Sequence, residues 1–128
     1  MSDAAPDVAL NYRSIKTRIA DAASAAGRDP NAITLIAVAK RQPADRIVRL
    51  LELGHRVFGE NRVEEAAARW PGLRRSYSGI QLHMVGALQS KKCADAVALF
   101  DAIHSLDRTK LASKLAEQTD EQDRSPEL

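Results

Sequence analysis

The stretch Ile33-Thr34-Leu35-Ile36-Ala37-Val38-Ala39-Lys40 decides the fold predicted for this chain. Its first seven residues are almost continuously apolar and rich in β-branched side chains, which is typical of a strand buried on both faces of a parallel sheet. Lys40 ends this run, and Pro43 follows it and precedes a helical pattern. In a β/α barrel the ligand-binding groups lie at the C-terminal ends of the strands. An amine at that position is well placed to form an imine with a carbonyl group.

Helical and strand-like segments alternate on both sides of this stretch. Before it, an apolar stripe over residues 8–26 predicts a first helix, and Gly27 is expected to end that helix. After it, Pro43 is expected to open a second helix that ends at Gly54. Residues 56–59 then form the next candidate strand.

The same alternation continues to the end of the chain. The expected elements are a helix over 63–70, a polar loop over 73–79, a strand over 80–86, a helix over 90–100, a strand over 101–106 and a last helix with Leu111 and Leu115 on its inner face. Pro71-Gly72 is expected to stop the first of these helices, and Asp107 to cap the last. The polar segment 118–127 has no periodicity and is expected to be a connector.

One helix followed by four βα units predicts an α/β fold with a parallel sheet and right-handed crossovers. We expect residues 1–128 to form a single partial β/α-barrel domain, the N-terminal half of a (β/α)8 TIM-type barrel. An open doubly wound sheet is the main alternative. No G-x-G-x-x-G motif or P-loop follows any predicted strand, which disfavours the nucleotide-binding form of that alternative.

Composition limits the classes of partner. The chain has 19 basic and 17 acidic residues and a net charge of +2, which argues against a nucleic-acid or membrane partner. No apolar run approaches the ~20 residues of a membrane span, and the N-terminus lacks the pattern of a secretory signal. Cys93 is the single cysteine, so no disulfide forms within the chain, which suits a reducing cytoplasm. We expect Cys93 to be buried as a small apolar residue.

Lys40, Asn61, His83 and Gly86 lie at predicted strand ends and are the candidate binding residues. A free lysine has a pKa of about 10.4, and desolvation lowers that pKa and so frees the amine for imine formation. Each candidate also has a purely structural interpretation. Lys40 would reach solvent from a strand end, and Asn61 would cap a helix. His83 would be a core histidine, and Gly86 would simply end a strand.

Metal binding is not predicted. The three histidines, His55, His83 and His104, lack the spacing of metal ligands with one another or with Cys93. We therefore expect no metal site.

Four stretches, in this order and at this spacing, closely resemble the pyridoxal phosphate homeostasis proteins, the YggS-type family known as PROSC in animals. The stretches are 35–40, 58–61 with Val63 and Glu65-Ala66 after it, 83–92 and 99–107. The resemblance implies a single β/α barrel of the alanine racemase type (PLP fold type III). It also implies that Lys40 forms an imine with pyridoxal 5′-phosphate (PLP), with Asn61 beside the cofactor and His83 and Gly86 in a strand that lines the same pocket.

The same resemblance implies a role in intracellular PLP homeostasis, with PLP and PLP-dependent apoenzymes as partners and no established reaction. Ala39 and Arg41 stand where the family usually has serine and threonine. The family's second half supplies a Ser- and Gly-rich phosphate cradle and an arginine that faces the pyridine nitrogen. Because neither is in this chain, we expect it to be truncated and its PLP binding to be weak.

Two alternatives remain open at this point. The first is a PLP-dependent amino-acid racemase-like enzyme, which needs a second base, usually a tyrosine from another domain. Tyr12 and Tyr77, the only tyrosines, are predicted on an outer helix and in a loop, which disfavours it. The second is a half-barrel that does not bind PLP and self-associates through its open sheet edges.

Overall fold

The computed structural model describes residues 7–128 and divides the chain into two compact units. The first unit contains the residues up to Leu35 together with Gln42–His55. The second unit contains Ile36–Arg41 and Arg56–Leu128. Lys40 and the other three candidate binding residues all belong to the second unit.

The first unit contains α1 (Val8–Ala25), the 3-10 turn η1 (Pro30–Ala32) and α2 (Ala44–Glu52). The carboxylate of Asp7 accepts a hydrogen bond from the Leu10 N–H at 2.9 Å and caps α1. Gly27 follows α1 with φ +71°, as a helix-ending glycine requires, which confirms the predicted first helix and its stop. Pro43 lies one residue before the first helical residue of α2 rather than in the helix.

The two helices of this unit pack together through a small apolar core. Ala9 of α1 and Ile47 and Leu51 of α2 are buried. His55 is also buried, and its Nδ1 lies 3.1 Å from the Tyr12 hydroxyl. This hydrogen bond provides a polar partner for the buried imidazole.

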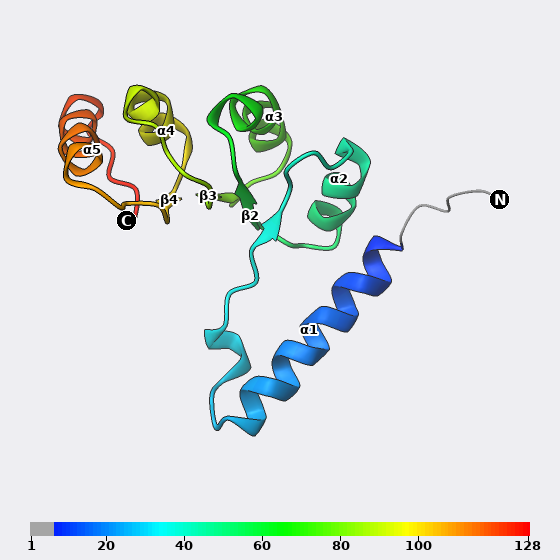
Figure 1. Cartoon of the computed structure of the whole chain (residues 1–128). Coiled ribbons are helices and arrows are strands. Elements are labelled where there is room, and N and C mark those ends of the chain that lie inside the picture. The colour runs from blue at the N-terminus through cyan, green and yellow to red at the C-terminus, as the bar shows by residue number, and fades with distance from the viewer. Residues whose placement is uncertain (1–6) are drawn as a thin grey trace. The chain divides into compact units, whose positions relative to one another are not determined.

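The second unit is built on a four-stranded parallel sheet in the order β1-β2-β3-β4 (Figure 1). The strands are β1 (Ala37–Val38), β2 (Val57–Glu60), β3 (Gln81–Met84) and β4 (Ala102–Ile103). Each new strand adds to the same side of the sheet, without the reversal of order that marks a doubly wound fold. The predicted α/β fold, half of a β/α barrel, is confirmed.

The helices of this unit lie on one face of the sheet (Figure 1). They are α3 (Val63–Ser76), the 3-10 turn η2 (Ser90–Lys92) with α4 (Cys93–Leu99), and α5 (Thr109–Gln122). The core between the sheet and these helices consists of side chains that are almost fully buried, among them Phe58, Ala66, Trp70, Leu82, Met84, Cys93, Val97, Phe100, Ile103, Leu111 and Leu115. The predicted burial of Cys93 and the inner face of the last helix are confirmed.

The strands are shorter than their apolar runs predict. The run 33–39 pairs as a strand only at Ala37–Val38, and the Ala39 N–H adds one further bond to the Gly59 carbonyl at 2.9 Å. Its partner β2 begins only at Val57, which in this parallel register lies opposite Ile36, so residues 33–35 have no strand of β2 beside them to pair with. The prediction of a strand buried on both faces is wrong for this run, because Ala39 is its only buried residue and Val38 is 45% exposed. Strand length depends on the neighbouring strand.

The expected stop at Pro71-Gly72 is wrong, because α3 continues to Ser76 and includes part of the predicted loop 73–79. Pro71 removes one helical hydrogen bond, but it lies on the exposed side of the helix, where water can satisfy the freed carbonyl. The last turn is held by Arg74, whose Nη1 donates to the Leu99 carbonyl at 2.8 Å. A tertiary contact therefore stabilises a turn that local sequence disfavours.

Two expectations near the C-terminus are also wrong. Asp107 does not cap α5: Arg108 occupies the cap position, and the Asp107 carboxylate pairs with that arginine at 2.6 Å. The segment 118–127 is not a simple connector, since α5 extends to Gln122. Glu127 then bridges Ala102 in parallel fashion, so a fifth strand position begins beside β4.

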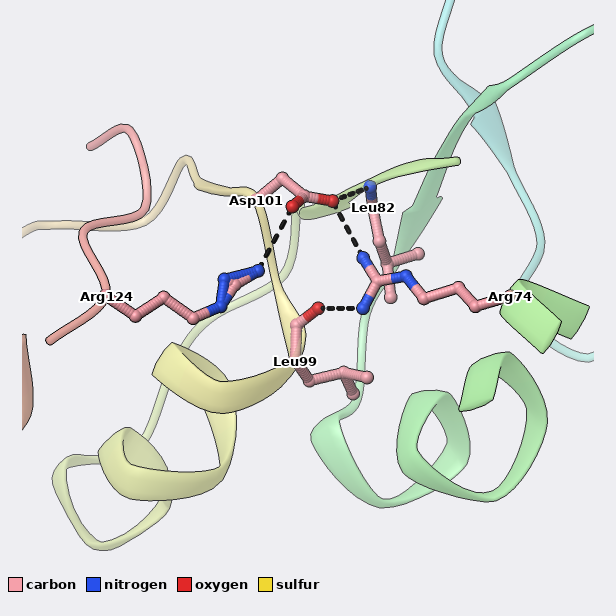
Figure 2. A network of polar contacts seen from close by, with 5 residues as sticks. All are labelled: Arg74, Leu82, Leu99, Asp101 and Arg124. Carbon is pink, nitrogen blue, oxygen red and sulfur yellow. Dashed lines mark hydrogen bonds and ion pairs between the residues drawn. The ribbon is translucent and has the colours of Figure 1, made fainter. Parts of the chain in front are cut away.

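Asp101 joins four segments of the second unit (Figure 2). One carboxylate oxygen accepts from Arg74 Nη2 at 2.7 Å and from the Leu82 N–H at 2.8 Å. The other accepts from Arg124 Nη2 at 3.1 Å. A single carboxylate thus connects α3, the start of β3, β4 and the segment after α5.

Asp101→Ala is expected to lower the free energy of unfolding by about 1–3 kcal/mol, because the N–H of buried Leu82 loses its acceptor. The carboxylate is 37% exposed, so its ion pairs add little to this value. Urea unfolding measures the change, with Asp107→Ala as the matched control, since that exposed carboxylate pairs with its neighbour Arg108. Equal stability of the two variants would contradict the role of Asp101.

No helix within residues 7–128 is both long and apolar enough to span a membrane. The absence of a secretory signal concerns the N-terminal segment, and residues 1–6 of that segment lie outside the described part of the chain.

Candidate functional site

Lys40 lies in the turn that follows β1, at the C-terminal end of the strand, as predicted. Lys40 is exposed to solvent. The next residue, Arg41, has φ +57°, a left-handed conformation that is unusual for any residue other than glycine. The amine of Lys40 is therefore carried on a tight and locally strained turn.

Helix α3 contacts the backbone on both sides of Lys40. Arg69 Nη1 donates to the Ala39 carbonyl at 2.8 Å. The Arg41 N–H donates to Glu65 Oε1 at 2.7 Å. Glu65 and Arg69 are four residues apart, so both side chains project from the same side of the helix.

A cavity of about 440 Å³ opens beside this turn. Its lining residues come from the loops after β1, β2 and β3, and they are Lys40, Arg41, Asn61, Arg62, Glu65, Gly86 and Ala87. The volume lies within the roughly 300–1,000 Å³ range of small-molecule sites. Three cationic side chains and one carboxylate give the lining a positive excess, which suits an anionic ligand.

Gly86 allows the loops after β2 and β3 to approach each other. A Cβ atom at this position would lie 2.6 Å from the Asn61 carbonyl oxygen, well inside van der Waals contact. Asn61 itself does not cap α3, because Arg62 occupies that position and no side chain caps the helix. Both residues therefore shape the wall of the cavity.

Gly86→Ala is expected to destabilise the chain by about 1–3 kcal/mol, because the new methyl group must displace the Asn61 backbone. Gly72→Ala is the matched control: its Cβ would meet only Arg75 Nη2, at 3.7 Å, and alanine favours the helix. Thermal unfolding of both variants measures the difference. A stabilised Gly86→Ala variant would show that the two loops do not need this close approach.

His83 does not line the cavity and instead pairs with His104. Its Nδ1 lies 2.8 Å from His104 Nε2, and the ring centroids are 5.1 Å apart. Burial and the neighbouring His104 together lower the pKa of His83. The structure therefore brings together Lys40, Asn61 and Gly86, and places His83 in a histidine pair that the sequence did not reveal.

Glu60 is a buried carboxyl group beneath the site. It is 0% exposed; its Oε2 accepts from Trp70 Nε1 at 2.8 Å and lies 3.9 Å from Arg69 Nη1. Burial raises the pKa of Glu60, and the hydrogen bond from Trp70 only partly opposes this. Sequence reasoning assigned no role to Glu60, Glu65 or Arg69. The four-residue spacing of Glu65 and Arg69 places both on one side of the predicted helix, but it does not indicate which groups they contact.

The raised pKa of Glu60 predicts a specific pH dependence of stability. A carboxyl group with a higher pKa in the folded state binds more protons there, so its contribution to stability falls as pH rises from about 4.3 through the folded-state pKa. The difference in unfolding free energy between the wild type and Glu60→Gln should follow this trend, because glutamine does not titrate. A difference that stays constant from about pH 4 to about pH 8, a range that begins near the ordinary pKa of glutamate and extends above it, would contradict the prediction.

Among residues 7–128, no group of three or more His, Cys, Asp or Glu side chains is arranged to hold a metal ion.

Comparison with known proteins identifies relatives for most of the chain. No protein-family model matches. The pyridoxal phosphate homeostasis protein of Escherichia coli K12 is 36% identical over 113 residues, which are 88% of this chain and 48% of that protein. The protein of the same name from Pseudomonas aeruginosa is 38% identical over 111 residues, 87% of this chain and 47% of that protein.

Solved structures with a similar fold include relatives of the same kind. PipY of Synechococcus elongatus, in a structure with PLP bound, is 41% identical with a TM-score of 0.71, over 84% of this chain and 51% of PipY. The crystal structure of an unknown protein from Bifidobacterium adolescentis matches 98% of this chain and 56% of its own, with a TM-score of 0.86 at 26% identity. This chain spans about half the length of the curated relatives it matches. Over that half, the chain is similar in sequence to the pyridoxal phosphate homeostasis proteins and in fold to PipY, a member of the COG0325 family.

Proposed function

We propose that this chain binds PLP at Lys40 and acts in the homeostasis of that cofactor. The observation that carries the proposal is the primary amine of Lys40, presented from a strand end beside a positively lined cavity. When bound, PLP supplies an aldehyde to which a lysine amine can attach covalently. The family name and the PLP-bound structure of PipY support this assignment.

The residues present fit the group. PLP carries a phosphate, and the guanidinium groups of Arg41 and Arg62 line the cavity with Lys40. We also assign Asn61, His83 and Gly86 to cofactor binding. Asn61 and Gly86 line the same cavity, and His83 follows buried Leu82 on β3, so it projects to the face of the sheet away from the helices.

The proposed role is storage and delivery of PLP to PLP-dependent apoenzymes in the cytoplasm, rather than turnover of a substrate. An exposed lysine lets the cofactor be taken up and released without opening a core. A racemase would need a second base, and neither tyrosine lines the cavity: Tyr12 pairs with His55, and the Tyr77 ring contacts the Arg56 guanidinium at 5.5 Å. The free, buried Cys93 is compatible with a reducing compartment.

We further propose that the chain self-associates through its sheet. Strand β1 is an edge strand, and Val38 on it is 45% exposed. An exposed apolar edge favours pairing with another strand. Size-exclusion chromatography with mass determination should therefore show a species heavier than the 14.0 kDa monomer.

Titration with PLP tests the main proposal. We expect an absorbance band of the lysine-bound cofactor that develops only with PLP in excess, in line with the weak binding expected from the sequence, and borohydride reduction followed by peptide mapping should place the adduct on Lys40. A specific site would be refuted if the label were spread evenly over the exposed lysines and if its total amount equalled that found on the unfolded chain.

A further inference from the structure

We infer that Glu65 and Arg69 are positioning residues for Lys40: from α3, they hold the turn 39–41 so that the Lys40 amine faces the cavity. The inference deepens the proposed function and rests on it. The inference concerns the conformation of the turn 39–41, and the accessibility of the Lys40 amine reports on that conformation in the absence of PLP.

The first argument is the placement of the two hydrogen bonds. They engage the peptide groups on either side of Lys40: Arg69 at the Ala39 carbonyl, 2.8 Å, and Glu65 at the Arg41 N–H, 2.7 Å. Each bond has one charged partner, and such bonds are shorter and stronger than those between neutral groups. Lys40 is therefore fixed at both its N-terminal and C-terminal sides by one helix.

The second argument is the conformation of Arg41. Its φ of +57° is unfavourable for a residue with a Cβ atom, so the surroundings must hold it there. The contact observed at that residue's amide is the Glu65 carboxylate. Removal of this acceptor allows Arg41 to relax to an ordinary conformation, which redirects the residue before it.

The third argument is that the arginine side is anchored in the core. The Arg69 side chain is only 18% exposed, and its Nη1 lies 3.9 Å from Glu60, which is itself held by Trp70. A guanidinium fixed in this way has little freedom to leave the Ala39 carbonyl. The turn is thus linked to the rigid part of the second unit.

The experiment compares Glu65→Ala with Glu65→Gln, whose amide oxygen can still accept from Arg41, and with Glu117→Ala on α5 as the exposed control. The first readout is trace acetylation of Lys40 relative to exposed Lys110, without PLP. For Glu65→Ala we expect this ratio to change from its wild-type value by about threefold, because the side chain of Lys40 is no longer held in one direction when the charged hydrogen bond to Arg41 is lost. Glu65→Gln should shift less, and Glu117→Ala should match the wild type.

The second readout is PLP affinity, expected to fall about tenfold in Glu65→Ala, as for loss of one charged hydrogen bond. In an Arg41→Gly background the same Glu65→Ala change should have a smaller effect, because glycine adopts the left-handed conformation unaided. A merely structural role of Glu65 does not give this rescue.

Arg69→Ala, compared with Arg75→Ala at an exposed site on the same helix, tests the other side of the turn if Glu65→Ala does not fold. It should also shift the acetylation ratio of Lys40 by about threefold. An unchanged ratio in the folded variants overturns the inference. If the wild type forms no PLP adduct, the proposed function fails, and the acetylation ratio still decides the positioning role.

Discussion

Lys40→Ala is expected to abolish the specific PLP adduct of this chain, with a loss of affinity on the order of 100-fold or more. The physical reason is that only a primary amine attaches covalently to the cofactor aldehyde, and Lys40 is the one lysine that lines the cavity of the described chain. Absorbance titration and borohydride trapping measure the loss.

Two variants make this result specific. Lys40→Arg keeps the positive charge in the cavity, but its guanidinium stays protonated and does not condense, so it should also give no trapped adduct. Lys110→Ala removes an exposed lysine on α5 and should bind as the wild type does. An adduct of undiminished yield in Lys40→Ala would show that the cofactor attaches elsewhere.

Trp70→Ala is expected to be the most destabilising single substitution, with a loss of about 3–5 kcal/mol in the free energy of unfolding. Trp70 is 0% exposed, its ring lies 4.8 Å from that of Phe58, and its N–H provides the hydrogen bond to buried Glu60. The substitution thus removes a large apolar side chain and leaves a buried carboxyl group without its donor. Denaturant unfolding measures the change.

Trp70→Phe separates these two effects. It keeps most of the ring but removes the donor to Glu60, which should cost about 1–3 kcal/mol. Arg75→Ala, on the exposed side of the same helix, should change stability by less than about 0.5 kcal/mol. If Trp70→Ala were no more destabilising than Arg75→Ala, the packing of α3 against β2 would contribute nothing to the fold.

The order of the helices and strands could be predicted because it depends on local patterns. The stripe over residues 8–26 has the period of a helix, and the apolar run before Lys40 has the short, continuous, β-branched pattern typical of a strand in a parallel sheet. Alternation of βα units then leaves few topologies, and the parallel sheet followed. Turn residues were less reliable: Gly27 ended a helix as expected, but Pro71 did not, because the bonds of Arg74 to Leu99 and Asp101 hold the turn after it.

For the site, the strand-end positions of Lys40, Asn61 and Gly86 followed from the sequence, and the structure gathers them around one cavity. The residues that hold the turn around Lys40 could not be predicted from the sequence. Glu65 and Arg69 form hydrogen bonds with the backbone of a segment more than 20 residues away in the chain. A hydrogen bond to a peptide group leaves no periodic signal in the sequence.

The sequence by itself determined the succession of elements, the sheet they form and the strand end that carries the amine, since each depends on hydrophobic period and on the handedness of βα units. Only the tertiary structure decided where strands end, that His83 meets His104, and that α3 holds the turn around Lys40. These features depend on the distance between groups far apart in the chain, and that distance exists only after the helices have packed on the sheet.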